Sequence, residues 1–216
     1  MNIRTKKLTT VAMLSAIAYT VMVLGRFPVV MFLKYDPKDI VITLGGLIWG
    51  PLTAFVVSVI VSFIEMLTVS ETGIIGLVMN IISSCAFACT ASAIYKHKRT
   101  LSGAVVGLLV GSLVMTSVML LWNYLVTPIY LGAPREEVVK LLIPAFLPFN
   151  LLKSGLNAAV SFLLYKPVIG ALRKSGYVSA PSGSVSAKRK AVGPVLIAAA
   201  VLASCVLAIL SMQGII

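Results

Sequence analysis

Residues 45–51 read Gly45-Gly46-Leu47-Ile48-Trp49-Gly50-Pro51 and lie within an uncharged run that covers 40–64. A run of this length is long enough for one membrane-spanning helix, which needs about 20 apolar residues. Glycine and proline also suit a tight turn, so the chain can instead reverse direction at Gly50-Pro51 and form two helices. The choice between one span and two sets the side of the membrane on which every later loop lies.

The composition of the whole chain is typical of a protein embedded in a lipid bilayer. Its 216 residues are 59% hydrophobic and 11% charged, with a mean hydropathy of +1.05, whereas a soluble domain carries about 25% charged residues. The net charge of +12 would suggest nucleic acid in a soluble protein. Here the basic residues form short clusters between apolar runs, so we expect an integral membrane protein and no nucleic-acid partner.

Loop charges select the interpretation with two spans. Twelve of the 18 basic residues form four clusters without an acid: Arg4, Lys6 and Lys7; Lys96, Lys98 and Arg99; Lys166, Arg173 and Lys174; and Lys188, Arg189 and Lys190. The positive-inside rule places such clusters in the cytoplasm. The acids lie in other regions, at Asp36, Asp39, Glu65, Glu71, Glu136 and Glu137. A single span over 40–64 would put the Lys96–Arg99 loop outside, whereas a turn at Gly50-Pro51 returns every basic cluster to the inside.

The turn makes the first of the two helices short. Residues 40–49 would form a helix of only about 15 Å, which is tolerated where other protein surrounds it or where it lines a cavity. The sequence then predicts an all-α integral membrane protein in the cell membrane, with six transmembrane helices and a cytoplasmic amino terminus. The predicted helices cover 8–25, 38–49, 51–67, 73–95, 101–126 and 141–170.

The carboxyl-terminal region extends beyond this bundle. We predict a six-helix membrane domain over 1–175, a flexible basic cytoplasmic linker over 176–190, and an additional transmembrane helix over 191–216. The extra helix is rich in Ala, Val and Leu and lacks a polar face, so we interpret it as an appendage rather than part of a site. The first apolar run resembles a signal peptide, but its length favours an anchor that is retained.

Lys153 is the residue that most strongly indicates a binding site, because a charged side chain inside a membrane is costly and usually functional. It lies in the apolar helix predicted over 141–170. Asn150, Ser154 and Asn157 share its helical stripe, at i, i+3, i+4 and i+7. A hydrogen-bond network between helices is the structural alternative. The lysine has no acid in the same run, which favours a ligand site over that alternative.

Two further asparagines are candidates for the same cavity. Asn123 lies near the end of the fifth predicted helix, where its amide offers a hydrogen-bond donor and an acceptor together. Asn80 forms a polar patch with Ser83 and Ser84 in the fourth helix, where helix packing is an equal explanation. Tyr124 is better explained as part of an interfacial aromatic belt.

Several absences limit the function. The chain contains no Gly-x-x-x-x-Gly-Lys-Ser/Thr loop, so it cannot power transport by its own ATP hydrolysis. No buried pair of acids indicates proton coupling, and we expect Glu65 and Glu71, at the outer ends of their helices, to be solvated. The three cysteines are interpreted as packing residues, and no catalytic or metal-ligating set can be assembled. An intramembrane enzyme is therefore the least favoured class.

Five sequence features together resemble the S components of energy-coupling factor transporters, over residues 5–175. They are Ala12-x-x-x-Ala16, the loop Leu33-Lys34-Tyr35-Asp36-Pro37-Lys38-Asp39-Ile40, the segment 45–51, Asn123 ahead of Pro128-x-Tyr130, and Pro148-Phe149-Asn150-Leu151-Leu152-Lys153. The alanine pair and the Gly-Pro turn are shared across that family. The last two features are similar to its riboflavin-binding type.

The resemblance implies a substrate-capture subunit whose cavity opens to the exterior and whose transported ligand, rather than cofactor, is riboflavin. By motif matching, Asn123, Asn150 and Lys153 would hydrogen-bond the polar edge of the isoalloxazine ring. Residues 31–39 would cover the ligand. The expected ligand-binding residues are Asn80, Asn123, Tyr130, Asn150, Lys153 and Asn157.

The resemblance also implies partners. Ala12 and Ala16 would contact a transmembrane coupling protein, which carries two cytoplasmic ATPases, and small residues four apart suit such close helix contact. The seventh helix departs from the family plan.

Two other classes of transporter stay open. The first is an S component for thiamine, biotin or pantothenate. It is distinguished from a riboflavin-binding S component by whether the asparagine–lysine set binds a planar imide edge. A stand-alone secondary transporter or channel would work without ATPases and would depend on an ion gradient.

Overall fold

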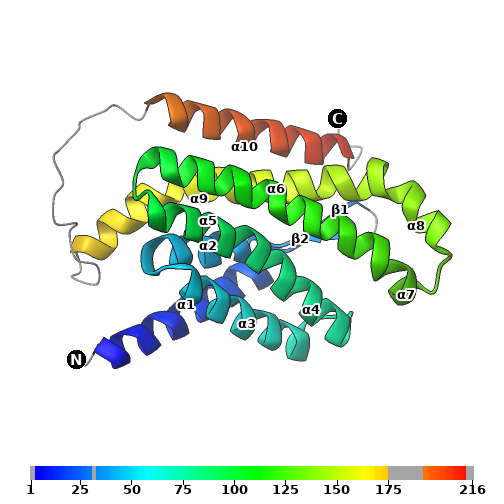
Figure 1. Cartoon of the computed structure of the whole chain (residues 1–216), viewed down its shortest axis with the longest axis horizontal. Coiled ribbons are helices and arrows are strands. Elements are labelled where there is room, and N and C mark those ends of the chain that lie inside the picture. The colour runs from blue at the N-terminus through cyan, green and yellow to red at the C-terminus, as the bar shows by residue number, and fades with distance from the viewer. Residues whose placement is uncertain (1–2, 31–32, 175–191, 213–216) are drawn as a thin grey trace.

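The computed structural model describes residues 3–30, 33–174 and 192–212, which form helices, one hairpin and the short loops between them (Figure 1). The bundle comprises α1 (Ile3–Gly25), α2 (Lys38–Trp49), α3 (Pro51–Thr68), α4 (Gly73–Ser84), α5 (Thr90–His97), α6 (Leu101–Leu125), α7 (Thr127–Leu131), α8 (Arg135–Leu141) and α9 (Leu147–Lys174). Helix α10 (Val192–Met212) follows, and strands β1 (Phe27–Val30) and β2 (Leu33–Tyr35) form the hairpin. The predicted all-α membrane fold is confirmed.

The chain reverses between α2 and α3 at Gly50, as predicted. The backbone of Gly50 has φ 103° and ψ 168°, a region that essentially only glycine adopts. Pro51 begins α3, a position at which its missing N–H has no intrahelical partner to lose. Lys7, Lys96 and Arg99 line one groove beside this turn. The turn therefore lies at the same end of the bundle as two of the basic clusters, as the loop charges required.

Among the described residues, six helical segments are long and apolar enough to cross a membrane: Lys7–Gly25, Pro51–Thr68, Gly73–His97, Leu101–Leu125, Arg135–Leu172 and Gly193–Ser211. Helix α2 has only 12 residues, or about 18 Å, against a hydrocarbon core of about 30 Å. It packs among α1, α3, α5 and α9. Protein rather than lipid therefore surrounds the short helix, and its polar first turn lies inside the bundle.

Two predicted helix boundaries differ from the structure. The first helix begins at Ile3 rather than at residue 8, and the last helix of the bundle extends back through the π-helical segment Leu142–Phe146 to α8. A second π-helical segment, Cys85–Cys89, joins α4 to α5. Such π-helical turns are frequent at functional sites, and Leu142–Phe146 ends one turn before Asn150.

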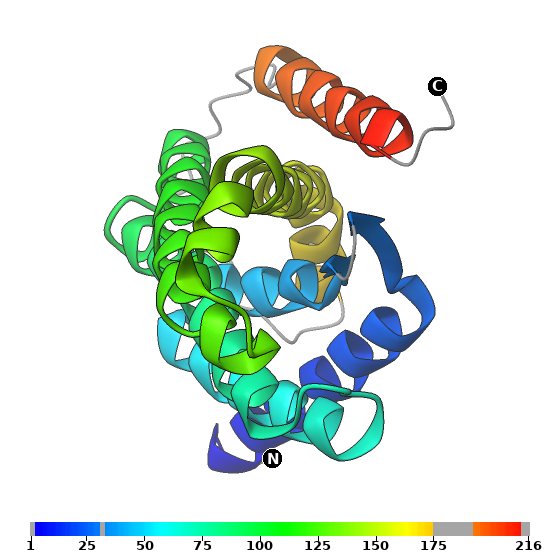
Figure 2. The same cartoon turned by 90° about the vertical axis from the view of Figure 1, so that its right-hand side faces the viewer.

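The hairpin was not predicted from the sequence. Strands β1 and β2 pair antiparallel between α1 and α2, with Phe27 opposite Tyr35. The hairpin lies beside the carboxyl-terminal part of α10, which packs along α9 (Figure 2). The predicted seventh helix is thus present as α10, whereas the predicted linker over 176–190 lies outside the described residues.

Candidate functional site

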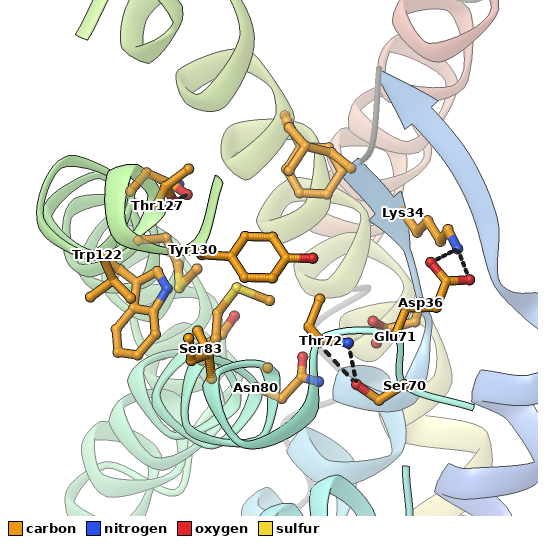
Figure 3. A pocket seen from close by; sticks show the side chains of 18 of the residues that line it. Lys34, Asp36, Ser70, Glu71, Thr72, Asn80, Ser83, Trp122, Thr127 and Tyr130 are labelled. Atoms are coloured by element: carbon orange, nitrogen blue, oxygen red, sulfur yellow. Dashed lines mark hydrogen bonds and ion pairs between the residues drawn. The ribbon is translucent and has the colours of Figure 1, made fainter. Parts of the chain in front are cut away.

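A cavity of about 280 Å³ lies at the end of the bundle that is remote from the Gly50 turn. Its wall is built by the hairpin, the end of α3 with the loop after it, α4, the end of α6, α7 and the start of α9. The volume is close to the lower end of the range for small-molecule sites, roughly 300–1,000 Å³. Figure 3 shows Tyr130 reaching into the cavity between Trp122 on one side and the Lys34–Glu71 pair on the other.

The wall combines apolar side chains with a limited number of polar groups, as is typical of small-molecule sites. The larger apolar side chains are Leu33, Ile75, Met79, Met119, Trp122 and Phe149. Lys34 and Glu71 form an exposed ion pair of 3.2 Å that joins the hairpin to the α3–α4 loop at the mouth. The cavity therefore combines apolar walls with polar groups, including an ion pair at its mouth.

The structure brings most of the predicted site residues to this cavity. The predicted residues that line it are Asn80, Asn123, Tyr130, Asn150 and Lys153. Asn157 does not line it and is fully buried beneath the wall. Asn157 instead accepts a hydrogen bond of 2.9 Å from the Tyr35 hydroxyl and donates one of 3.4 Å to Asp39. Its contacts are those of a positioning residue.

Two asparagines keep unused hydrogen-bonding atoms at the cavity wall. Asn123 Oδ1 accepts from the Thr127 hydroxyl at 2.9 Å, and Asn150 Nδ2 donates to the Phe146 carbonyl at 2.8 Å. Within the described residues, no hydrogen bond occupies Asn123 Nδ2 or Asn150 Oδ1. The site therefore presents an amide donor, an amide acceptor and the ammonium group of Lys153 to a ligand.

Lys153 is paired with acids from a distant segment, which corrects the expectation of an unpaired cation. Its Nζ lies 3.7 Å from Asp36 Oδ2 and 3.7 Å from Asp39 Oδ2. Both acids are buried, so the chain contains a buried pair of acids that was not predicted from the sequence. The two carboxylates offset the charge of the ammonium, and both separations exceed ordinary hydrogen-bond length, so its N–H donors can turn to a ligand.

Glu65 was expected to be solvated, and this expectation was wrong. Its side chain is 2% exposed and forms ion pairs with Arg26 and Lys38. Asn80 Nδ2 donates to the same carboxylate at 3.0 Å. Lys38 also lies 3.8 Å from Asp36, so one continuous network contains three cations and three anions. Glu71 is exposed, as predicted.

Neighbouring charges control the protonation of the loop residues in this network. Burial would raise the pKa of Asp36, but Lys153, Lys38 and Arg26 together hold that pKa below its usual range. Asp36 is therefore a carboxylate, and its Oδ1 has no hydrogen-bond partner among the described residues. Burial, with the nearby acids, raises the pKa of Tyr35 well above its usual value. Tyr35 is therefore a permanent hydroxyl donor to Asn157.

The buried acids escaped prediction because their partners come from far along the chain. The available signal was the length of α2: a helix of about 18 Å cannot cross a core of about 30 Å. Residues at its amino-terminal end must then lie within the membrane thickness. Applied to the loop Asp36-Pro37-Lys38-Asp39, this reasoning would have predicted buried charges that need partners.

Helix α1 presents the predicted small-residue face. Ala12 and Ala16 are exposed, in line with Leu8, which is 72% exposed. Val11, Ala18 and other residues on the opposite face pack into the bundle. The alanine pair is therefore accessible to another membrane helix.

The fold and site define a multi-pass membrane protein with a ligand cavity at one end of its helical bundle. A family model described as "ECF transporter, substrate-specific component" matches residues 6–165. The chain therefore belongs to the family of substrate-specific components of ECF transporters. As in that family, its role is in transport.

Curated relatives and a solved structure agree with this assignment. The riboflavin transporter RibU of Staphylococcus aureus (strain TCH60) is 29% identical over 78% of this chain and 93% of its own. The riboflavin transporter FmnP of Bacillus subtilis (strain 168) is 32% identical over 75% of this chain and 91% of its own. A structure described as "Structure and mechanism of the S component of a bacterial ECF transporter" matches with a TM-score of 0.67 and 30% identity, covering 79% of this chain and 99% of that one.

Loss of the Glu65 charge should be strongly destabilising. Glu65→Gln leaves Arg26 and Lys38 without a full counter-charge in the protein interior, and breaking a buried ion pair costs about 3 kcal/mol or more. Glu71→Gln removes an exposed charge and should cost less than about 1 kcal/mol. Thermal unfolding of the detergent-purified variants measures the difference. Equal shifts for the two variants would contradict the buried network.

Proposed function

We propose that this chain is the substrate-capture subunit of an ATP-driven importer and that its ligand is riboflavin. The observation that carries the proposal is the set of unused groups at the cavity wall: a donor on Asn123, an acceptor on Asn150 and a donor on Lys153. The imide edge of an isoalloxazine ring presents the complementary groups, which are two carbonyl acceptors flanking one N–H donor. The names of the similar transporters of S. aureus and B. subtilis support the same ligand.

The remainder of the cavity suits the rest of a flavin. Met79, Met119, Trp122 and Phe149 provide the apolar walls against which a planar ring system can pack. Lys34 and Glu71, which form an exposed ion pair and line the cavity, offer a donor and an acceptor for hydroxyl groups. Polar groups of both kinds are needed, because riboflavin joins an apolar ring to a polyhydroxyl chain.

The proposed orientation places the amino terminus in the cytoplasm and the cavity towards the exterior of the cell membrane. The positive-inside rule supports this orientation, since Lys7, Lys96 and Arg99 gather at the end of the bundle remote from the cavity. Bound riboflavin would then be captured from outside. The chain would act as a carrier of ligand and not as an enzyme.

The proposed partners are a transmembrane coupling protein and two cytoplasmic ATPases. Family membership supports this assembly, and the exposed Ala12 and Ala16 offer a surface that another helix can approach closely. The energy for import would come from the ATPases, since the chain has no phosphate-binding loop.

Riboflavin binding is tested by fluorescence-quenching titration of the detergent-purified chain, with thiamine and biotin as competitors. We expect saturable quenching at one riboflavin per chain and no effect of the other vitamins. Lys153→Met should weaken binding by about 10- to 100-fold, because a charge-assisted hydrogen bond is lost. Lys140→Met, at an exposed lysine that does not line the cavity, is the matched control. Tight binding of thiamine or biotin in place of riboflavin would overturn the assignment of ligand.

The docking face is tested separately by Ala16→Trp. A bulky side chain at this exposed position should leave riboflavin affinity unchanged and should prevent co-purification of the coupling protein and ATPases with the tagged chain. Ala200→Trp, at an exposed alanine of α10, controls for the added surface indole. Normal assembly of the Ala16→Trp variant would show that the coupling protein docks elsewhere.

A further inference from the structure

Helix α10 lies outside the part of the chain that the family comparisons cover. The family model matches residues 6–165, and 79% of this chain suffices to cover 99% of the solved S component. The helix nevertheless packs on the bundle: it contacts α9 along its length and also contacts β1. Helix α10, which the family comparisons do not cover, therefore contacts the hairpin that borders the ligand cavity.

The inward face of α10 is a stripe of Ala198, Leu202, Cys205 and Ile209. Leu202, Cys205 and Ile209 share one apolar cluster with Val29 and Tyr35 of the hairpin. The same cluster contains Leu33 and Phe149, which also line the cavity. The apolar packing is thus continuous from α10, through the hairpin, to the cavity wall.

The hairpin needs such support. Its strands have four and three residues, and a two-stranded hairpin has at best marginal stability on its own in water. Short segments with little buried surface open at low free-energy cost. Val29 and Tyr35 are buried in the apolar cluster that also contains Leu202, Cys205 and Ile209 of α10, so loss of this packing would lower the cost of moving the hairpin away from the cavity.

A series of polar contacts leads from Tyr35 of the hairpin to the ligand site. Tyr35, which belongs to the same apolar cluster as Cys205, donates to Asn157 at 2.9 Å. Asn157 donates to Asp39 at 3.4 Å, and Asp39 lies 3.7 Å from Lys153. Displacement of the hairpin would break the Tyr35–Asn157 hydrogen bond and so remove support from the Asn157–Asp39 contact beside the lysine of the site.

We propose that α10 is a brace that holds the β1–β2 hairpin against the cavity and thereby slows the exchange of ligand. Tyr35 and Asn157 are positioning residues that transmit its effect to Lys153. The inference rests on the proposed function only for the identity of the ligand. Movement of the hairpin itself can be measured without any ligand.

The first test locks α10 in place. A β-carbon at Gly155 would lie 3.3 Å from Cys205 Sγ, close to the separation that a disulfide requires. Gly155→Cys, in a background of Cys85→Ala and Cys89→Ala, should therefore form a disulfide with Cys205. The oxidised protein should release riboflavin more slowly than the same protein after reduction. Hydrogen exchange of the amides at 27–30 and 33–35 should be slower as well.

The second test loosens the brace. Cys205→Ala with Ile209→Ala removes buried side-chain volume, whereas Val206→Ala with Leu207→Ala removes the same kind of volume from the exposed face of α10. The double substitution on the buried face should accelerate riboflavin dissociation and hydrogen exchange of the hairpin amides roughly fivefold or more. The double substitution on the exposed face should change neither rate.

The outcomes separate this inference from the proposed function. The brace would be overturned if amide hydrogen exchange in the hairpin changed neither with the Gly155→Cys disulfide nor with the Cys205→Ala, Ile209→Ala substitutions. If hydrogen exchange in the hairpin changed but the rate of riboflavin release did not, α10 would not control the release of ligand. Changed hairpin exchange in a protein that binds no riboflavin would uphold the brace as a structural element and overturn the proposed ligand.

Discussion

The structure depends on the neutralisation of charge inside a membrane protein. Three cations, Arg26, Lys38 and Lys153, meet three anions, Asp36, Asp39 and Glu65, in one buried network. Each of these charges would be costly alone. Together they tie the loop after α1, the first turn of α2, the end of α3 and the start of α9 into one unit. The ligand cavity borders this unit, so the contacts that stabilise the fold also fix the position of the Lys153 group proposed to bind the ligand.

The short helix α2 explains why the charges are buried at all. A full-length span would carry Asp36, Lys38 and Asp39 to the membrane surface, where water would solvate them. The turn at Gly50 instead begins α3 early and leaves the start of α2 within the protein. Protein on every side makes this arrangement tolerable. The hairpin before α2, covered in turn by α10, closes the structure over the site.

Local sequence features predicted the parts of the fold that depend on local chemistry. The Gly50-Pro51 turn follows from backbone preferences and loop charge, and the position of Lys153 beside Asn150 follows from helical spacing. The partners of Lys153 and Glu65 could not be inferred in this way, because they lie more than 25 residues away and are chosen by packing. Asn157 shares the stripe of Lys153, yet it points to Tyr35 and Asp39. Helical periodicity assigns a face and does not distinguish a cavity wall from the layer beneath it.

The central claim is that Lys153 both completes a neutral network and binds the ligand, and the most direct measurement is thermal unfolding with and without riboflavin. Lys153→Met leaves one buried carboxylate in excess and should unfold at a lower temperature than the unsubstituted chain. Adding Asp39→Asn restores neutrality and should recover most of the stability, while a given concentration of riboflavin should stabilise the unsubstituted chain much more than either variant. Full stability of Lys153→Met alone, or stabilisation of the double variant by riboflavin to the same extent as the unsubstituted chain, would contradict the account.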